Sequence, residues 1–235
     1  IINSSASAAT LSIGGTLTGP GTTFTPGTYL TVDFTGASQT IPQLAGNYYN
    51  LILSGSGTDV LSSSITTITG NFTVGGTVTT ATTANLAITG NLSTGNGTSL
   101  TIGAYTLSVG GTTTVGGGSS GALAFSSATN PAKTFTGLVT INAGASWTEN
   151  AAITPTFKGG ISNSGTIIAG TGIHTFNTNS QALSGSLSIP SVTVTGVTLT
   201  NNGTLSVTSA LAGTGGLTNG AGCTLNLGFT GTVGI

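Results

Sequence analysis

Short runs of alternating apolar and polar residues recur along the chain, and glycine or asparagine ends most of them. One stretch predicts strands at 72–74, 77–79 and 86–88, with a turn at 75–76 and a corner at 80–83. Alternation with a period of two is typical of strands that bury one face. Glycine and asparagine suit the corners because they adopt positive backbone φ angles at little cost. The pattern predicts an all-β protein built from short strands.

A glycine that introduces a strand recurs at drifting intervals along the chain. Its positions are Gly46, Gly70, Gly90, Gly110, Gly137, Gly160, Gly185 and Gly203. A period of about 20–25 residues indicates a solenoid in which each coil is one structural unit. The favoured fold is therefore a β-solenoid, similar to a parallel β-helix, with coils of about 20–25 residues. Tandem β-sandwiches are the alternative, because their strands recur too, at about 8–12 residues.

Two segments interrupt this rhythm. Residues 1–30 contain Pro20 and Pro26 and predict an N-terminal arm or cap, which leaves 31–235 as the repetitive solenoid domain. Residues 117–135 combine a glycine and serine run with an Asn-Pro pair, so they predict a longer loop or a bulged coil.

Charge is almost absent from the chain. Charged residues make up 2% of the 235 residues, against roughly 25% in a typical soluble domain. The two cations and three acids leave a net charge of −1. Nucleic-acid binding is not expected, because phosphates are neutralised by lysine and arginine. No apolar run has the roughly 20 residues of a membrane helix, so we expect no membrane insertion. Weak charge repulsion instead favours self-association.

The ionisable side chains offer little chemistry. Asp33 and Asp59 could lie on adjacent coils as the carboxylate pair of a polysaccharide-active enzyme, but these acids and Glu149 also fit solvated turns or edges. His174 is the one histidine, and a metal site needs several ligands, so we expect it on the surface of a strand. Cys223 is expected to pack as a small apolar residue. We predict a protein that is not an enzyme and has no catalytic residues, metal or cofactor.

Aromatic and threonine side chains suggest two kinds of surface contact. Tyr48, Tyr49 and Trp147 could stack on sugar rings, although packing in the core is the favoured interpretation. Threonines on the outer strands raise an ice-binding alternative. A flat array needs threonines at a fixed spacing on successive coils, and the drifting period predicts a ragged one.

A distinctive stretch contains Gln-Thr-Ile-Pro at 39–42, Tyr-Tyr-Asn-Leu at 48–51, Gly-Ser-Gly-Thr at 55–58 and Gly-Asn at 70–71. It resembles the repeats of large secreted surface proteins of Bacteroidetes-type bacteria. The resemblance implies an extracellular or cell-surface β-rich protein of adhesin-like character, and it implies no catalytic residues.

The two ends of the chain carry the favoured functional hypothesis. No charged side chain occurs before Asp33 or after Lys158, and apolar residues alternate up to the last position. Unpaired edge strands are templates for strand addition. We therefore predict a structural subunit of an extracellular filament or surface fibre, with other copies of the chain as partners. The residues expected at the joining ends are Ile1, Ile2, Leu11, Ile13, Leu225, Leu227, Phe229, Val233 and Ile235. An adhesin stalk, or a module that binds glycans or surfaces, is the alternative.

Overall fold

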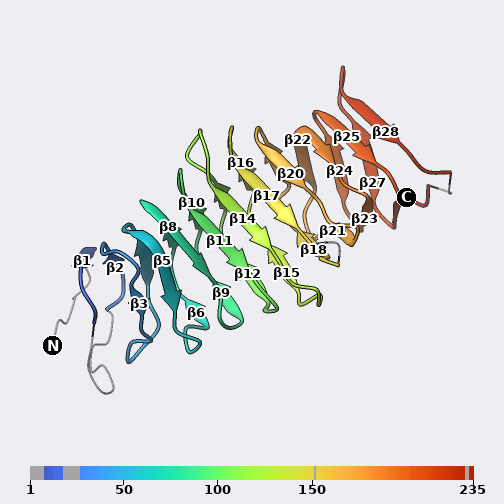
Figure 1. Ribbon diagram of the computed structural model, residues 1–235. Helices are drawn as coiled ribbons and strands as arrows, with labels where there is room; N and C mark the ends of the chain where they lie inside the picture. Colours follow the sequence, from blue (N-terminus) through green and yellow to red (C-terminus); the bar gives the residue numbers. More distant parts are fainter. Residues whose placement is uncertain (1–7, 18–26, 151, 231–232) are drawn as a thin grey trace.

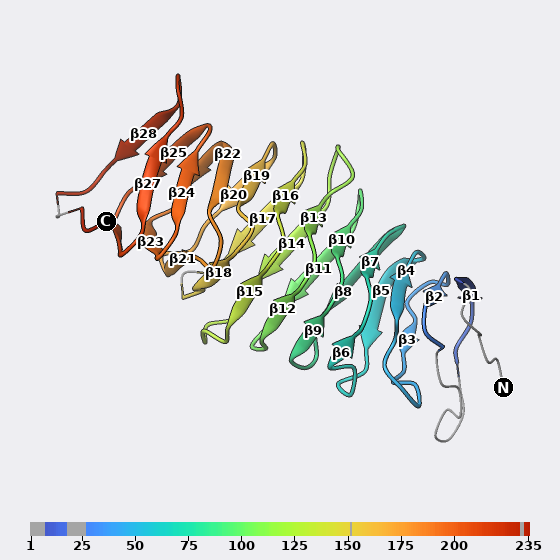
Figure 2. The same cartoon turned by 180° about the vertical axis from the view of Figure 1, so that it is seen from behind.

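The computed structural model describes residues 8–17, 27–150, 152–230 and 233–235 of the chain. These residues form 28 β-strands and no helix. The strands wind into a rod of stacked coils, with the first and the last described strands at opposite ends of the rod (Figure 1; Figure 2 shows it from behind). The predicted all-β class is confirmed.

Three sheets run along the rod. Sheet A contains, in order, β1 (Ala9–Ile13), β2 (Leu30–Phe34), β4 (Asn50–Leu53), β7 (Phe72–Val74), β10 (Leu92–Thr94), β13 (Thr113–Val115), β16 (Val139–Ile141), β19 (Ile161–Asn163), β22 (Gln181–Ser188), β24 (Thr198–Asn201) and β27 (Gly216–Asn219). Sheet B contains β3 (Thr40–Ile41), β5 (Ser56–Leu61), β8 (Thr77–Ala81), β11 (Ser99–Ile102), β14 (Ala122–Phe125), β17 (Ser146–Glu149) and β20 (Thr166–Ile168). Sheet C contains β6 (Thr67–Ile68), β9 (Leu86–Ile88), β12 (Leu107–Val109), β15 (Lys133–Phe135), β18 (Pro155–Phe157), β21 (Ile173–Asn177), β23 (Ser191–Thr195) and β26 (Ala210–Gly213).

A typical coil contributes one strand to each sheet. The coil of β7, β8 and β9 has the three strands that the sequence predicts, with β8 extended to Ala81. Every pairing between the named strands is parallel and joins successive coils. The β-solenoid prediction is therefore confirmed. The sandwich alternative is wrong, because hairpin-connected sandwiches pair their strands antiparallel.

The core forms because inward positions on each short strand are apolar. Phe72 and Val74 on sheet A, Val78 on sheet B and Ile88 on sheet C are all buried. Residues stack over their equivalents in the next coil, as Phe72 does over Leu92. Burying one such side chain stabilises the fold by about 1.5–3 kcal/mol, so a column of them holds the coils together.

Glycine is required at one corner by close packing of the backbones. The amide of Gly90 donates to the carbonyl of Gly70 at 2.9 Å, Gly111 donates to Gly90 at 2.8 Å, and Gly137 donates to Gly111 at 3.1 Å. A Cβ atom on Gly90, Gly111 or Gly137 would lie within 2.8 Å of the preceding coil's backbone. Asn71 and Asn91, beside this corner, each accept a hydrogen bond from the next coil at 2.8 Å.

The recurring glycine that introduces a strand does not mark this corner in every coil. In the coil of β4 the equivalent position is Tyr49, whose carbonyl accepts from Gly70, and not Gly46. Gly185 and Gly203 stack on each other at the other end of the sheet A strands, where Gly185 aligns with Asn163. The period drifts because successive coils differ in their corners.

The two irregular segments both supply strands to the stack. Within residues 1–30, β1 pairs in parallel with β2 over five residue pairs, so it continues sheet A. Ile1 and Ile2 lie outside the described residues. The segment 117–135 contains β14 and β15, which pair with their neighbours in sheets B and C. Its extra length lies in corners, which agrees with the predicted bulged coil.

The coil pattern changes near the C-terminal end of the rod. Sheet B ends at β20, and the eight-residue β22 runs on from sheet A to pair through its last residues with β25 (Thr204–Val207). β25 then pairs with β28 (Thr224–Leu227). The last coils are shorter, with 18 residues between stacked Asn201 and Asn219.

Candidate functional site

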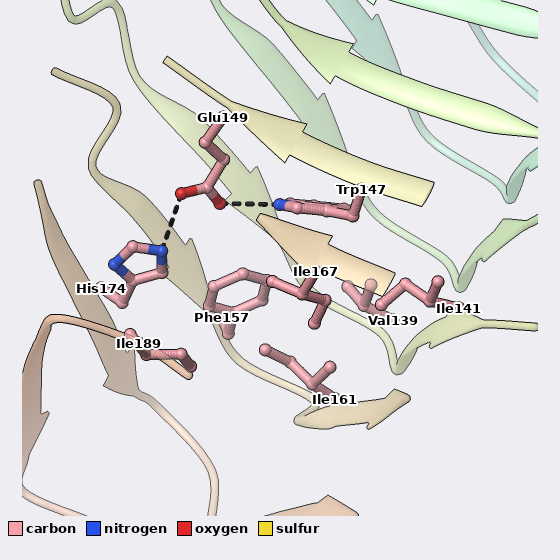
Figure 3. Close-up of a pocket in the computed structure, with 9 residues that line it drawn as sticks. All are labelled: Val139, Ile141, Trp147, Glu149, Phe157, Ile161, Ile167, His174 and Ile189. Carbon is pink, nitrogen blue, oxygen red and sulfur yellow. Dashed lines mark hydrogen bonds and ion pairs between the residues drawn. The ribbon is translucent and has the colours of Figure 1, made fainter. Parts of the chain in front are cut away.

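A buried polar cluster lies in the middle of the rod, where β17, β21 and the corner before β21 meet (Figure 3). The carboxylate of Glu149 makes three polar contacts in this cluster. Its Oε1 accepts from the indole Nε1 of Trp147 at 2.7 Å, and its Oε2 accepts from the amide of Gly170 at 2.8 Å. The Nε2 atom of His174 lies 2.8 Å from the same Oε2. The cluster joins side chains of two successive coils.

The other ring nitrogen fixes the histidine tautomer. Nδ1 of His174 lies 3.0 Å from the carbonyl oxygen of Gly172, which can only accept, so Nδ1 carries a proton. The Nε2 atom is then the ring nitrogen that faces Glu149, at 2.8 Å from Oε2. Both residues are buried, which corrects the expectation of a surface histidine and a solvated acid. Two isolated ionisable residues 25 positions apart gave no signal of this contact.

Aromatic rings enclose the cluster. Phe135, Phe157 and Phe176 stack along sheet C, with centroids 5.6 and 5.3 Å apart, and Trp147 lies 5.0 Å from Phe135. The cavity beside them has a volume of about 10 Å³ and is lined by aliphatic and aromatic side chains as well as Glu149 and His174. That is about the space of one water molecule. The cluster therefore binds coil to coil and offers no room for a substrate.

The two remaining acids are not paired. Asp33 lies on the outer side of β2, half-buried, and accepts from the Ser54 hydroxyl at 2.7 Å. Asp59 points inward from β5 in sheet B. Asp33 and Asp59 therefore lie on adjacent coils but in different sheets. This arrangement does not form the carboxylate pair of a polysaccharide-active enzyme.

Asp59 is a buried acid with one unused oxygen, and not a solvated one as expected. Oδ1 accepts from the amide of Gln39 at 2.7 Å, whereas Oδ2 is buried with no hydrogen-bond partner. Burial raises the pKa of the Asp59 carboxyl, and the Gln39 hydrogen bond opposes that shift in part. The Gln39 side chain also donates to the carbonyls of Ile13 and Gly15 beside β1.

Lys133 is a buried cation without a carboxylate partner. It occupies an inward position of sheet C that Leu107 and Pro155 fill in the neighbouring coils. Its Nζ donates to the carbonyls of Tyr105 at 2.7 Å and Pro131 at 2.9 Å. Burial lowers the pKa of Lys133 to about 8. The amine therefore ties a corner to the coil before it.

The aromatic residues proposed for sugar stacking divide into two groups. Tyr48 and Trp147 are buried in the core, so the core interpretation is correct for both and neither ring has a free face. The Tyr48 hydroxyl donates to the carbonyl of Pro42 at 2.6 Å, and burial raises its pKa. Tyr49 is only half-buried, and its ring lies 5.1 Å from that of Tyr29, which is 49% exposed.

Threonines on the outer face of sheet C are aligned despite the drifting period. Thr134, Thr156, Thr175 and Thr193 pair in register along four successive strands. The drift was expected to make such arrays ragged. That reasoning is wrong, because length differences are absorbed in the corners and leave the strands in register.

The two ends of the rod present uncharged edge strands. At one end Leu11 and Ile13 of β1 pack on the core but stay partly exposed. At the other end Leu225 and Phe229 are partly buried, and Leu227, Val233 and Ile235 are 40–43% exposed. Gly234 forms a parallel bridge with Ala212, which adds one residue to sheet C. Cys223 lies in the last corner, partly exposed, with its Sγ 3.8 Å from the Ala221 carbonyl.

Among the described residues, no group of three or more histidine, cysteine or acidic side chains is placed to hold a metal ion. In the same part of the chain no helix is long and apolar enough to span a membrane. Comparison of the chain with protein-family models, with curated proteins and with solved structures finds no match in any of the three.

Proposed function

We propose that this β-solenoid is a structural subunit of an extracellular filament or surface fibre, assembled head to tail. One observation supports this proposal most directly. Within the described residues, the strands at both ends of the parallel stack lack a neighbour on one side and carry no charge. Natural solenoids usually protect such ends with polar caps, and unprotected edges recruit further strands.

Head-to-tail stacking is the arrangement that preserves the internal geometry. The edge of β27 and β28 faces away from the coils, and β1 faces away at the opposite end (Figures 1 and 2). Placing β1 of one copy on the last coil of another continues parallel pairing and covers Leu11 and Leu227. Such a contact joins two different surfaces, so it repeats without closing.

The same edges also fit a stalk, in which further coils of one longer polypeptide would cover them. The uniform parallel stack suits either role, since each coil contacts only its neighbours. The resemblance to bacterial surface repeats supports an extracellular place for both. The oligomeric state of the purified chain decides between them.

Two lysine substitutions test the polarity of assembly. Leu11→Lys at one end and Leu227→Lys at the other should each stop filament growth, because a charge on an edge opposes strand addition. Ser108→Lys, on an exposed position in the middle of sheet C, is the matched control and should still assemble. Mixing the two end variants should give dimers, since each retains one complementary end.

Electron microscopy and analytical ultracentrifugation give the readout. We expect filaments with strands stacked about 4.8 Å apart along the axis. A wild-type chain that stays monomeric at high concentration refutes the filament and favours the stalk. Dimers formed by either end variant alone would show head-to-head joining instead.

A further inference from the structure

Two tyrosines form an exposed pair near the N-terminal end of the rod. The rings of Tyr29 and Tyr49 meet edge to face, with centroids 5.1 Å apart and planes at 65°. Tyr29 is one of the most exposed large apolar side chains among the described residues, and Tyr49 is half-buried. Neither ring belongs to the hydrophobic core. The pair therefore adds exposed aromatic surface to the outside of the rod.

The backbone is unusual for a bulky residue at Tyr29, and Tyr49 interrupts a row of corner glycines. Tyr49 occupies the corner position where the following coils have Gly70, Gly90 and Gly111. Tyr29 has a φ of 69°, in the left-handed region that bulky residues avoid. Strain of this kind persists where the surrounding structure imposes it, and it is concentrated at binding sites. Packing alone does not explain two tyrosines here.

Uncharged polar residues neighbour the two tyrosines along the chain, which suits an uncharged ligand. Nδ2 of Asn50 donates to the hydroxyl of Thr31 at 3.2 Å, and Asn47 is exposed in the adjoining corner. The only charged side chain on β2 or β4 is Asp33, and no lysine precedes Lys133 in the chain. The site has no cation to hold an anionic ligand.

From these observations we infer that the Tyr29–Tyr49 pair is a binding site for a neutral glycan chain. The C–H face of a sugar ring packs on an aromatic face, and amides and hydroxyls beside it form hydrogen bonds to sugar hydroxyls. The inference does not depend on filament assembly, because the pair lies on a corner beside β2 and β4. A subunit with such a site would attach the rod to polysaccharide along its side.

Tyr29→Gly is the informative substitution. Glycine adopts the positive φ without strain, so this variant should keep or raise the melting temperature while it removes one ring. Leu138→Ala is the matched control, because it removes a similarly exposed apolar side chain from a corner outside the pair, where Leu138 is 41% exposed. A structural role for Tyr29 would instead show as a loss of stability.

The binding experiment uses four neutral hexasaccharides: cellohexaose, xylohexaose, mannohexaose and chitohexaose. Ligand-detected saturation-transfer NMR reports binding to monomers and to filaments. We expect at least one sugar to bind the wild type and Leu138→Ala, and to bind Tyr29→Gly at least tenfold more weakly. Binding by none of the four sugars, or unchanged binding by Tyr29→Gly, overturns the inference. Loss of filaments in Tyr29→Gly without any sugar binding to the wild type would assign the pair to a subunit contact.

Discussion

Glu149 and Asp59 are both buried acids on inward positions of sheet B, yet their surroundings differ. Glu149 has hydrogen-bonding contacts to an indole, a backbone amide and an imidazole, so both of its oxygens are satisfied. In Asp59, one carboxylate oxygen accepts a hydrogen bond from a backbone amide, and the other has no hydrogen-bond partner. The first acid connects two coils, whereas the second is tolerated at a cost.

The difference shows that the hydrogen-bonding partners of a buried charged group decide whether it stabilises or destabilises the fold. Removing one member of a satisfied buried cluster leaves unpaired polar groups, which is strongly destabilising. Neutralising an acid that lacks partners removes a desolvation penalty instead. In a chain with five charged residues, these two acids should therefore respond in opposite directions to substitution.

The largest effect is expected for Glu149→Leu. The substitution leaves the Trp147 indole, the Gly170 amide and the His174 ring without their partner, and should cost about 3–5 kcal/mol of unfolding free energy. Urea unfolding followed by circular dichroism measures this cost.

A double-mutant cycle with His174→Leu sharpens the same point. The Glu149→Leu/His174→Leu pair should be more stable than the sum of the single effects predicts, by about 1 kcal/mol or more. Additive effects would show that the contact between the two side chains does not contribute to stability.

Asp59→Asn should raise stability at neutral pH. Because the folded-state pKa of Asp59 is raised, the folded chain holds this proton to a higher pH than the unfolded chain does. Its ionisation therefore removes stability as the pH rises above the ordinary aspartate pKa of about 3.9. The variant should melt a few degrees higher than wild type at pH 7, about 2–4 °C for each kcal/mol gained.

The pH profile supplies the control for Asp59. Differential scanning calorimetry from pH 3 to pH 7 should show the gap between Asp59→Asn and wild type opening as the pH rises. A gap that widens toward acid would contradict the assigned direction.

Lys133 extends the comparison to a buried cation and should give the smallest effect. This effect should appear as a change in the slope of unfolding free energy against pH. Burial lowers its pKa to about 8, so the folded chain loses this proton before the unfolded chain does. The stability that the buried cation costs below pH 8 should be regained as the pH rises toward 10.5. The stability of wild type relative to Lys133→Met should therefore rise between pH 7 and pH 9.5, and ¹⁵N-detected titration of the amine checks the pKa.

Local patterns predicted the repeating unit well. The strands of the β7–β9 coil could be read from the alternation of Phe72, Val74, Val78 and Ile88 with polar neighbours, because an inward and an outward face alternate along any strand. The predicted corner glycines at Gly70 and Gly90 were also correct, since a Cβ atom at either position would lie 2.6 Å from a carbonyl oxygen of the preceding coil.

Long-range pairing decided the candidate sites. Nothing near Glu149 in the sequence indicates His174, and nothing near Tyr49 indicates Tyr29, because a coil must close before these side chains meet. Tyr48 and Tyr49 are adjacent and aromatic, yet one points into the core and the other toward solvent. Their difference depends on the direction in which the corner turns.

The sequence by itself determined a charge-poor rod of short parallel strands, because alternation and corner residues act over a few positions and repeat in every coil. Only the tertiary structure decided which side chains share a column, which acids find donors and which tyrosine stays exposed. Those outcomes depend on the length of each corner, which sets the stacking of one coil on the next without changing the pattern within the strands.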